Sequence, residues 1–274
     1  MTEAFDRTEY LLRFFHPERV LPPLPGVHRG IAAQLLGMDK DEYDARIAAL
    51  DVARSRIADD LLADTKVVSS LARVPFSTDQ LIVGLGDSLT DDFCSWFELL
   101  RLIFERHAPE RRVRFLNAGV SGYTTTQLLA RLPSITAARP DWVICFAGAN
   151  DTCRFGAAVA DPLTPIPQTI RNLQILRDGI VQETAAQWLW VTPVGVDEVI
   201  ANPHPFWRAL QAHWSARDVN TLAGEISALP GLVADLRGLF GENMDPKFLG
   251  ADGLHPTLAG QARIATAIIT SLAE

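Results

Sequence analysis

The chain has 274 residues, of which 48% are hydrophobic and 21% charged, a balance typical of a folded protein with one large core. Its formal net charge of −8 argues against nucleic acid or an anionic membrane as a partner, because both attract basic surfaces. Small or neutral substrates fit this composition better.

The amino terminus, MTEAFDRTEYLLRFF, contains acids and no continuous apolar run, and no later run has the length of a membrane span. We therefore expect a cytoplasmic protein without a secretory signal. The three cysteines, Cys94, Cys145 and Cys153, are an odd number without CxxC spacing. Neither a disulfide framework nor a zinc site is expected, and the thiols are interpreted as buried bystanders.

Residues 1–78 have a helical pattern and are predicted to form an amino-terminal arm. A first helix is expected around residues 10–15. A longer helix should begin at Asp39 or Asp41 and carry its apolar residues on one face, at Tyr43, Ile47, Leu50, Ile57 and Leu61. That face needs a partner, so the arm should fold onto a larger unit. Packing, a lid over a site and a dimer contact all fit this pattern.

Residues 79–274 alternate between short apolar runs and segments long enough for helices, which is typical of a doubly wound parallel sheet. The expected strands are 81–85, 113–116, 142–147, 188–192 and 232–236. The predicted fold is α/β, a flavodoxin-like three-layer sandwich with a five-stranded parallel sheet. Pro256 is expected at the first position of the last helix.

Polar residues gather where these strands end. The segments are GDSLTDD after the first strand, NAGVSGYTT after the second, GAND after the third, and DGLHPT before the last helix. All four should meet at the carboxyl edge of one sheet. In this order they resemble the blocks of the SGNH hydrolases, also called the GDSL esterase/lipase family, and the resemblance covers about residues 79–274. It implies a nucleophilic serine, oxyanion donors from a glycine and an asparagine, and an Asp-His pair near the end.

The chemistry of acyl transfer needs the same residue types. Ser88 is the candidate nucleophile, His255 the base that takes its proton, and Asp252 the group that orients the imidazole. The backbone N–H groups of Ser88 and Gly122 and the side-chain amide of Asn150 are the candidate oxyanion hole. This reaction needs no cofactor and no metal.

These observations predict a carboxylic ester hydrolase that acts on short acyl groups, acetyl above all, in a small soluble ester such as an acylated carbohydrate. An O-acyltransferase, or a lysophospholipase or thioesterase of the same family, is the alternative. A non-catalytic binding protein would be expected to have a broken triad. A dinucleotide-binding loop is disfavoured because Leu89 stands where its third glycine belongs. The segment between Thr192 and Leu232 should supply much of the substrate pocket. Its helically spaced Trp207, Leu210 and Trp214 are interpreted as packing rather than as a sugar platform.

Overall fold

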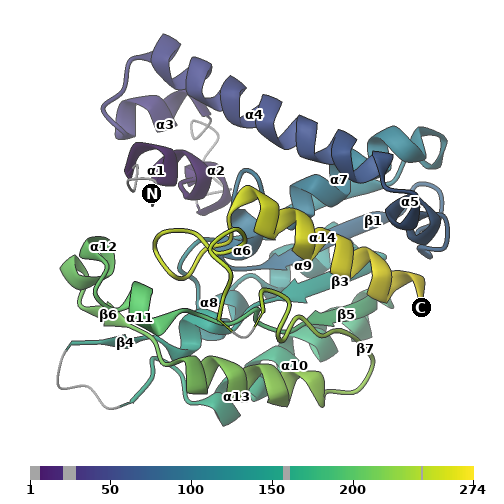
Figure 1. Ribbon diagram of the computed structural model, residues 1–274. Coiled ribbons are helices and arrows are strands. Elements are labelled where there is room, and N and C mark those ends of the chain that lie inside the picture. Colours follow the sequence, from purple (N-terminus) through teal and green to yellow (C-terminus); the bar gives the residue numbers. More distant parts are fainter. Residues whose placement is uncertain (1–6, 21–28, 157–160, 242) are drawn as a thin grey trace.

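The apolar runs predicted as strands form one five-stranded sheet in the order β2-β1-β3-β5-β7, and every neighbouring pair is parallel (Figure 1). This is the flavodoxin-like order predicted from the sequence. The strands are β1 (Leu81–Gly86), β2 (Arg114–Gly119), β3 (Trp142–Phe146), β5 (Gln187–Val191) and β7 (Leu232–Ala234). Gly86 pairs with Gly119 on one side and with Phe146 on the other. The first three strands therefore end side by side.

The computed structural model describes residues 7–20, 29–156, 161–241 and 243–274. The remaining residues of the predicted arm, 1–6 and 21–28, lie outside the described part. No helix in the described ranges is both long and apolar enough to span a lipid bilayer.

Helices cover both faces of the sheet and give the three layers that the alternating pattern predicted. On one face, Ile82, Ile144 and Leu189 lie in a core shared with α7 and α14. On the other face, Val83 and Val143 pack with α8, α9, α10 and α13. The helices of this unit are α6 (Ser88–Asp91), α7 (Trp96–His107), α8 (Thr125–Leu129), α9 (Leu132–Ala138), α10 (Ile166–Thr184), α11 (Glu198–Ala201), α12 (Pro205–Ala209), α13 (Ala216–Ser227) and α14 (Leu258–Ala273), with 3-10 turns η1 (Pro109–Arg111) and η2 (Ala149–Thr152).

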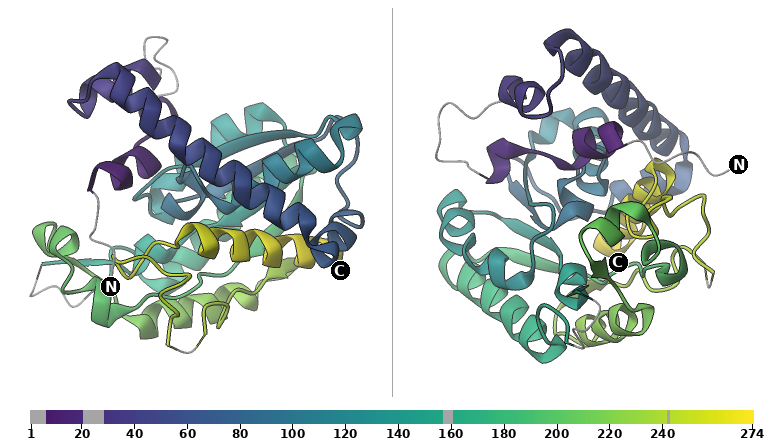
Figure 2. Two further views of the ribbon diagram at one scale, coloured as in Figure 1. Left: turned by 45° about the horizontal axis from the view of Figure 1, so that its top comes forward. Right: turned by 90° about the vertical axis from the view of Figure 1, so that its left-hand side faces the viewer.

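The amino-terminal region folds onto this sandwich. Its helices are α1 (Arg7–Phe14), α2 (Pro17–Val20), α3 (Arg29–Leu35), α4 (Lys40–Ala63) and α5 (Thr65–Leu71). Helix α4 packs against α7 and α14, and the left view of Figure 2 shows it beside the yellow α14. Asp39 caps α4 by accepting from the Asp41 N–H at 2.8 Å. The predicted apolar face of α4 contacts two different regions. Tyr43 packs with α1 and α3, whereas Ile57 packs on the main core.

Two local expectations were wrong. Helix α14 begins at Leu258 rather than at Pro256, because the Thr257 hydroxyl caps it by accepting from the Gly260 N–H at 3.1 Å. The helical spacing of Trp207 and Trp214 is interrupted by a two-residue strand, β6 (Ala212–His213), which pairs with β4 (Arg154–Phe155). Both indoles are nevertheless buried, with ring centroids 5.1 Å apart, so they pack as expected. Leu210, the third residue of this predicted packing set, is 51% exposed, so that part of the expectation was wrong.

Candidate active site

Ser88 lies two residues beyond the end of β1, at the first position of α6. The Asp87 carboxylate caps this short helix by accepting from the Leu89 N–H at 3.1 Å. The turn is possible because residue 86 is glycine: a Cβ there would lie 2.3 Å from the Phe146 carbonyl oxygen. The Ser88 side chain is thereby held at the carboxyl edge of the sheet, where open α/β sheets bind ligands.

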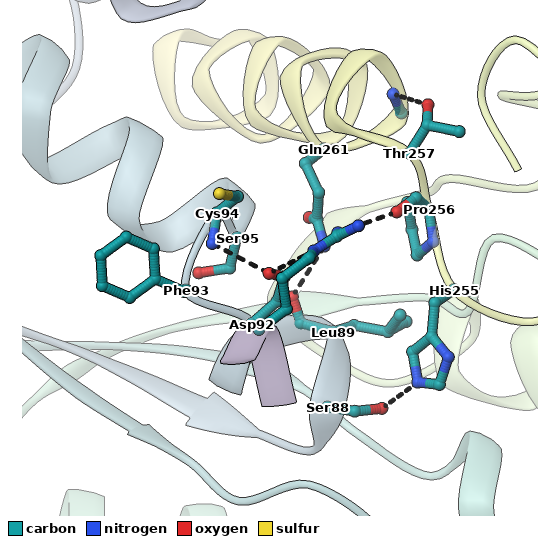
Figure 3. A network of polar contacts seen from close by, with 12 residues as sticks. Ser88, Leu89, Asp92, Phe93, Cys94, Ser95, His255, Pro256, Thr257 and Gln261 are labelled. Atoms are coloured by element: carbon teal, nitrogen blue, oxygen red, sulfur yellow. Dashed lines mark hydrogen bonds and ion pairs between the residues drawn. The ribbon is translucent and has the colours of Figure 1, made fainter. Parts of the chain in front are cut away.

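Asp252 and His255 lie on the loop between β7 and α14. The Asp252 Oδ1 accepts from the backbone N–H groups of Leu254 and His255, at 3.0 and 2.9 Å. Its Oδ2 lies 2.6 Å from His255 Nδ1. On the other side of the ring, His255 Nε2 lies 2.9 Å from the Ser88 Oγ, the contact drawn in Figure 3. The three residues, predicted from two blocks far apart in the sequence, therefore form one continuous chain of hydrogen bonds.

The charge state of Asp252 decides how His255 is protonated. Burial alone would raise the pKa of Asp252, but the charge of His255 and the hydrogen bonds from His255 and Leu254 outweigh it and lower this pKa below its ordinary value. An ionised Asp252 can only accept, so the proton of a neutral imidazole is placed on Nδ1. Nε2 then presents a lone pair to the Ser88 hydroxyl.

Gly122 and Asn150 lie on the loops that follow β2 and β3. Gly122 has φ +79°, a left-handed conformation that favours glycine. The Asn150 Nδ2 donates to the carbonyl of Tyr123 at 3.1 Å, which joins the two loops. An amide NH₂ has two hydrogens, so one remains for another acceptor.

The neighbouring Asp151 binds the start of α8, which follows the Gly122 loop, and also α10. Its carboxylate accepts from the Thr125 N–H at 2.9 Å and from the Thr169 hydroxyl at 3.1 Å, although burial raises its pKa. The position of Asn150 is therefore set by a buried network.

A small cavity adjoins Ser88. Its volume is about 20 Å³, and its walls include Ser88, Asn150, Leu254 and the segment Pro193–Gly195. The segment after β5 thus contributes to the pocket as predicted. Gly122 does not line the cavity, and its link to the site runs through Tyr123 and Asn150.

Aromatic side chains enclose the imidazole of His255, two of them from the amino-terminal region. The ring centroid of Phe14 lies 4.5 Å from that of His255, Tyr10 at 5.5 Å and Trp207 at 5.9 Å. Trp207 also donates its Nε1–H to the Asp252 carbonyl at 3.0 Å. The sequence predicted packing for this arm but not its contact with His255. The i, i+4 spacing of Tyr10 and Phe14 is the signal that could have indicated a shared face.

The described ranges offer neither an exposed cysteine nor a metal site. Cys94, Cys145 and Cys153 are free and buried, and burial raises the pKa of each thiol. Within these ranges no three His, Cys, Asp or Glu side chains gather in a way that could hold a metal ion.

Solved structures resemble this fold. LAE5, an alpha/beta hydrolase enzyme from the metagenome of Lake Arreo in Spain, is 24% identical, with a TM-score of 0.52 over 73% of this chain and 97% of its own. Axe2, an acetylxylan esterase from Geobacillus stearothermophilus, is 21% identical, with a TM-score of 0.51 over 72% and 95%. TesA is 24% identical, with a TM-score of 0.50 over 70% and 98%. At identities of 21% to 24%, these likenesses show that the folds are similar and nothing more.

The family is shown by the sequence itself. No curated protein matches the chain. Residues 85–263, which include Ser88, Gly122, Asn150, Asp252 and His255, match the model of the GDSL-like lipase/acylhydrolase family. The matched region spans most of the chain and carries the GDS block at its start and the Asp-His block near its end. The chain therefore belongs to the GDSL-like lipase/acylhydrolase family and is a carboxylic ester hydrolase.

Proposed function

We propose that the protein is a serine esterase that hydrolyses short acyl esters through Ser88, His255 and Asp252. The observation that carries this proposal is the pair of distances at His255, 2.9 Å from Nε2 to the Ser88 Oγ and 2.6 Å from Nδ1 to the Asp252 Oδ2. Both are within hydrogen-bond reach, as a nucleophile, a base and its orienting group require.

In the first half-reaction the Ser88 Oγ attacks the ester carbonyl carbon while its proton passes to His255 Nε2. Asp252 stabilises the imidazolium that forms. The oxyanion is held by the N–H groups of Ser88 and Gly122 and by the remaining amide hydrogen of Asn150, each such donor contributing about 3 kcal/mol. The intermediate then collapses, the alkoxide leaves with the proton from His255, and the acyl group stays on Ser88.

In the second half-reaction a water molecule attacks the acyl-enzyme. His255 takes the proton of that water, and the acid is released as the Ser88 Oγ recovers a proton. No cofactor takes part in either half. A hydroxyl of a second substrate in place of water would give O-acyl transfer instead.

The expectation of a short acyl group comes from the acidic chain, in which no basic amphipathic or long apolar segment is evident that would hold the protein at a lipid surface. The cavity of about 20 Å³ beside Ser88 is close to the room of one water molecule, less than even an acetyl group needs, so its volume does not set the acyl length. The substrate class is then a small soluble ester, acetylated carbohydrates among them.

The division of the chain into an amino-terminal arm, residues 1–78, and a catalytic domain, residues 79–274, belongs to this proposal. A cytoplasmic location stays a prediction from the sequence.

The test compares the wild-type protein with Ser88→Ala on p-nitrophenyl acetate. The variant should keep its melting temperature and lose turnover, because the hydroxyl supplies the nucleophile and not the core. Turnover of the ester at the wild-type rate by folded variant would overturn the proposal. In the wild type, acetate released in equal amount to p-nitrophenol, with an added sugar acceptor present, supports hydrolysis over transfer.

A further inference from the structure

Arg13 lies in α1, outside the residues that match the family model, yet its guanidinium contacts both loops of the site. Its Nε donates to the Asp92 Oδ1 at 3.0 Å, and its Nη2 donates to the Asp92 Oδ2. The same Nη2 donates to the carbonyl of Pro256 at 3.2 Å. A guanidinium nitrogen with two hydrogens can serve both acceptors at once.

The first acceptor, Asp92, is hydrogen-bonded to the backbone of the nucleophile, Ser88. The Asp92 N–H donates to the Ser88 carbonyl at 3.0 Å, so Asp92 closes the helical turn that begins at Ser88. The Arg13 carbonyl accepts from the Phe93 N–H at 2.8 Å, which fastens α1 to the same segment by the backbone. Gln261 of α14 also donates to the Asp92 Oδ2, at 3.1 Å (Figure 3).

The second acceptor is tied to the base. Pro256 directly follows His255, and Figure 3 shows its carbonyl on the side that faces Asp92. Because Phe14 packs on the His255 ring, the residue next to Arg13 reaches the same loop. One turn of α1 therefore holds both the imidazole and the backbone beside it.

The buried carboxylate of Asp92 compensates the charge of Arg13. Asp92 has no exposed surface, and the Arg13 side chain is 16% exposed. Burial would lower the pKa of Arg13, but the Asp92 carboxylate outweighs it and raises that pKa above its ordinary value. A bidentate arginine–carboxylate pair fixes geometry as well as charge.

We propose that Arg13 is a positioning residue of the active site, which sets the separation of the Ser88 turn from the His255 loop by binding Asp92 and the Pro256 carbonyl together. This proposal rests on the proposed function of Ser88 and His255. A shift of either loop would lengthen the 2.9 Å contact between Nε2 and Oγ, and displacements near 1 Å can cost about a hundredfold in rate.

The experiment is a double-variant cycle on the full chain, with p-nitrophenyl acetate turnover and melting temperature as readouts. Arg13→Met should lower kcat by about tenfold or more with KM within about twofold, and should lower the melting temperature because Asp92 loses its cation. Arg13→Met with Asp92→Asn removes the uncompensated charge. We expect the melting temperature to recover while kcat stays low. Asp92→Asn alone keeps Arg13 and its bond to Pro256, so it should turn over faster than the double variant.

Arg54→Met is the matched control. Arg54 is a buried arginine of α4 whose Nη1 donates to the Phe93 carbonyl at 2.9 Å, beside Asp92, and no contact of its side chain reaches the His255 loop among the described residues. Its replacement should lower the melting temperature and leave kcat unchanged.

The proposal is overturned if kcat recovers together with the melting temperature in the double variant, or if Arg13→Met and Arg54→Met lower kcat equally. It is also overturned if Arg13→Met turns over at the wild-type rate. Failure of the proposed function is distinct, because the wild type would then be inactive or Ser88→Ala active in the same assay.

Discussion

Replacement of Asp252 by asparagine tests the orientation of His255 at one atom. The Asp252 Oδ1 accepts from two backbone N–H groups, at 3.0 and 2.9 Å, so the oxygen of an asparagine amide stays there and its NH₂ faces His255 Nδ1. That NH₂ donates to Nδ1 and drives the imidazole proton onto Nε2. Nε2 can then no longer accept the proton of Ser88.

A base with the wrong tautomer costs a factor of about 10³ to 10⁴ in kcat, or about 4–5 kcal/mol of activation free energy. KM should change little, because Asp252 does not line the cavity beside Ser88. The assay is steady-state hydrolysis of p-nitrophenyl acetate by Asp252→Asn, with the melting temperature as a check of folding. Asp235→Asn is the control. The hydrogen bond from the Arg237 side chain lowers the pKa of Asp235 as well, and its side-chain hydrogen bonds go to Arg237 and Thr192 rather than to the triad. A loss of kcat below about tenfold would refute the assigned role of Asp252.

Further predictions concern the oxyanion hole, a buried acid and the acyl pocket. Asn150→Ala should lower kcat by about 10² to 10³ with little change in KM, and a change confined to KM would contradict the oxyanion role. Burial raises the pKa of Asp87 from 3.8 to about 7, against the lowering effects of the Leu89 N–H and of His255. The folded chain therefore keeps a proton that the unfolded chain releases, so this group's contribution to stability falls as the pH rises from about 4 to about 7. The free energy of unfolding of Asp87→Asn should exceed that of the wild type by an amount that grows to about 4 kcal/mol as the pH rises between these limits. Urea unfolding in which this difference between the two proteins stays constant with pH would argue against it. The kcat/KM for p-nitrophenyl esters should peak between acetyl and butyryl; a long apolar groove would instead raise it by about fourfold per methylene up to octanoyl, measured below the critical micelle concentration.

Most of the sheet could be predicted because buried parallel strands are nearly continuous apolar runs. LIVGLG and WVICF, which form β1 and β3, have this pattern, and their boundaries were found within one residue. The pair β4 and β6 was missed, since strands of two residues carry no periodicity. The four polar segments were placed at one sheet edge by the fold class, and Ser88, His255 and Asp252 lie within hydrogen-bond reach there.

The docking of the arm could not be predicted in the same way. Charged residues such as Arg13 and Arg19 ordinarily belong to a solvated helix face, and nothing local pairs them with the acids of GDSLTDD. In the structure Arg13 binds Asp92, and Arg19 and His16 bind Asp91, across more than seventy residues of sequence. Such pairs depend on where α1, α2 and the residues between them pack against the segment that follows β1, which is a property of the tertiary structure and not of a local pattern.

Covalent labelling of the serine tests the central claim most directly. A fluorophosphonate loses fluoride when an activated hydroxyl attacks its phosphorus, and the adduct can be located by mass spectrometry of peptides. The proposed mechanism predicts one adduct, on Ser88, formed in step with loss of p-nitrophenyl acetate hydrolysis and strongly slowed in His255→Gln. An adduct on another residue, or full loss of hydrolysis with Ser88 unmodified, would contradict the claim that Ser88 is the nucleophile.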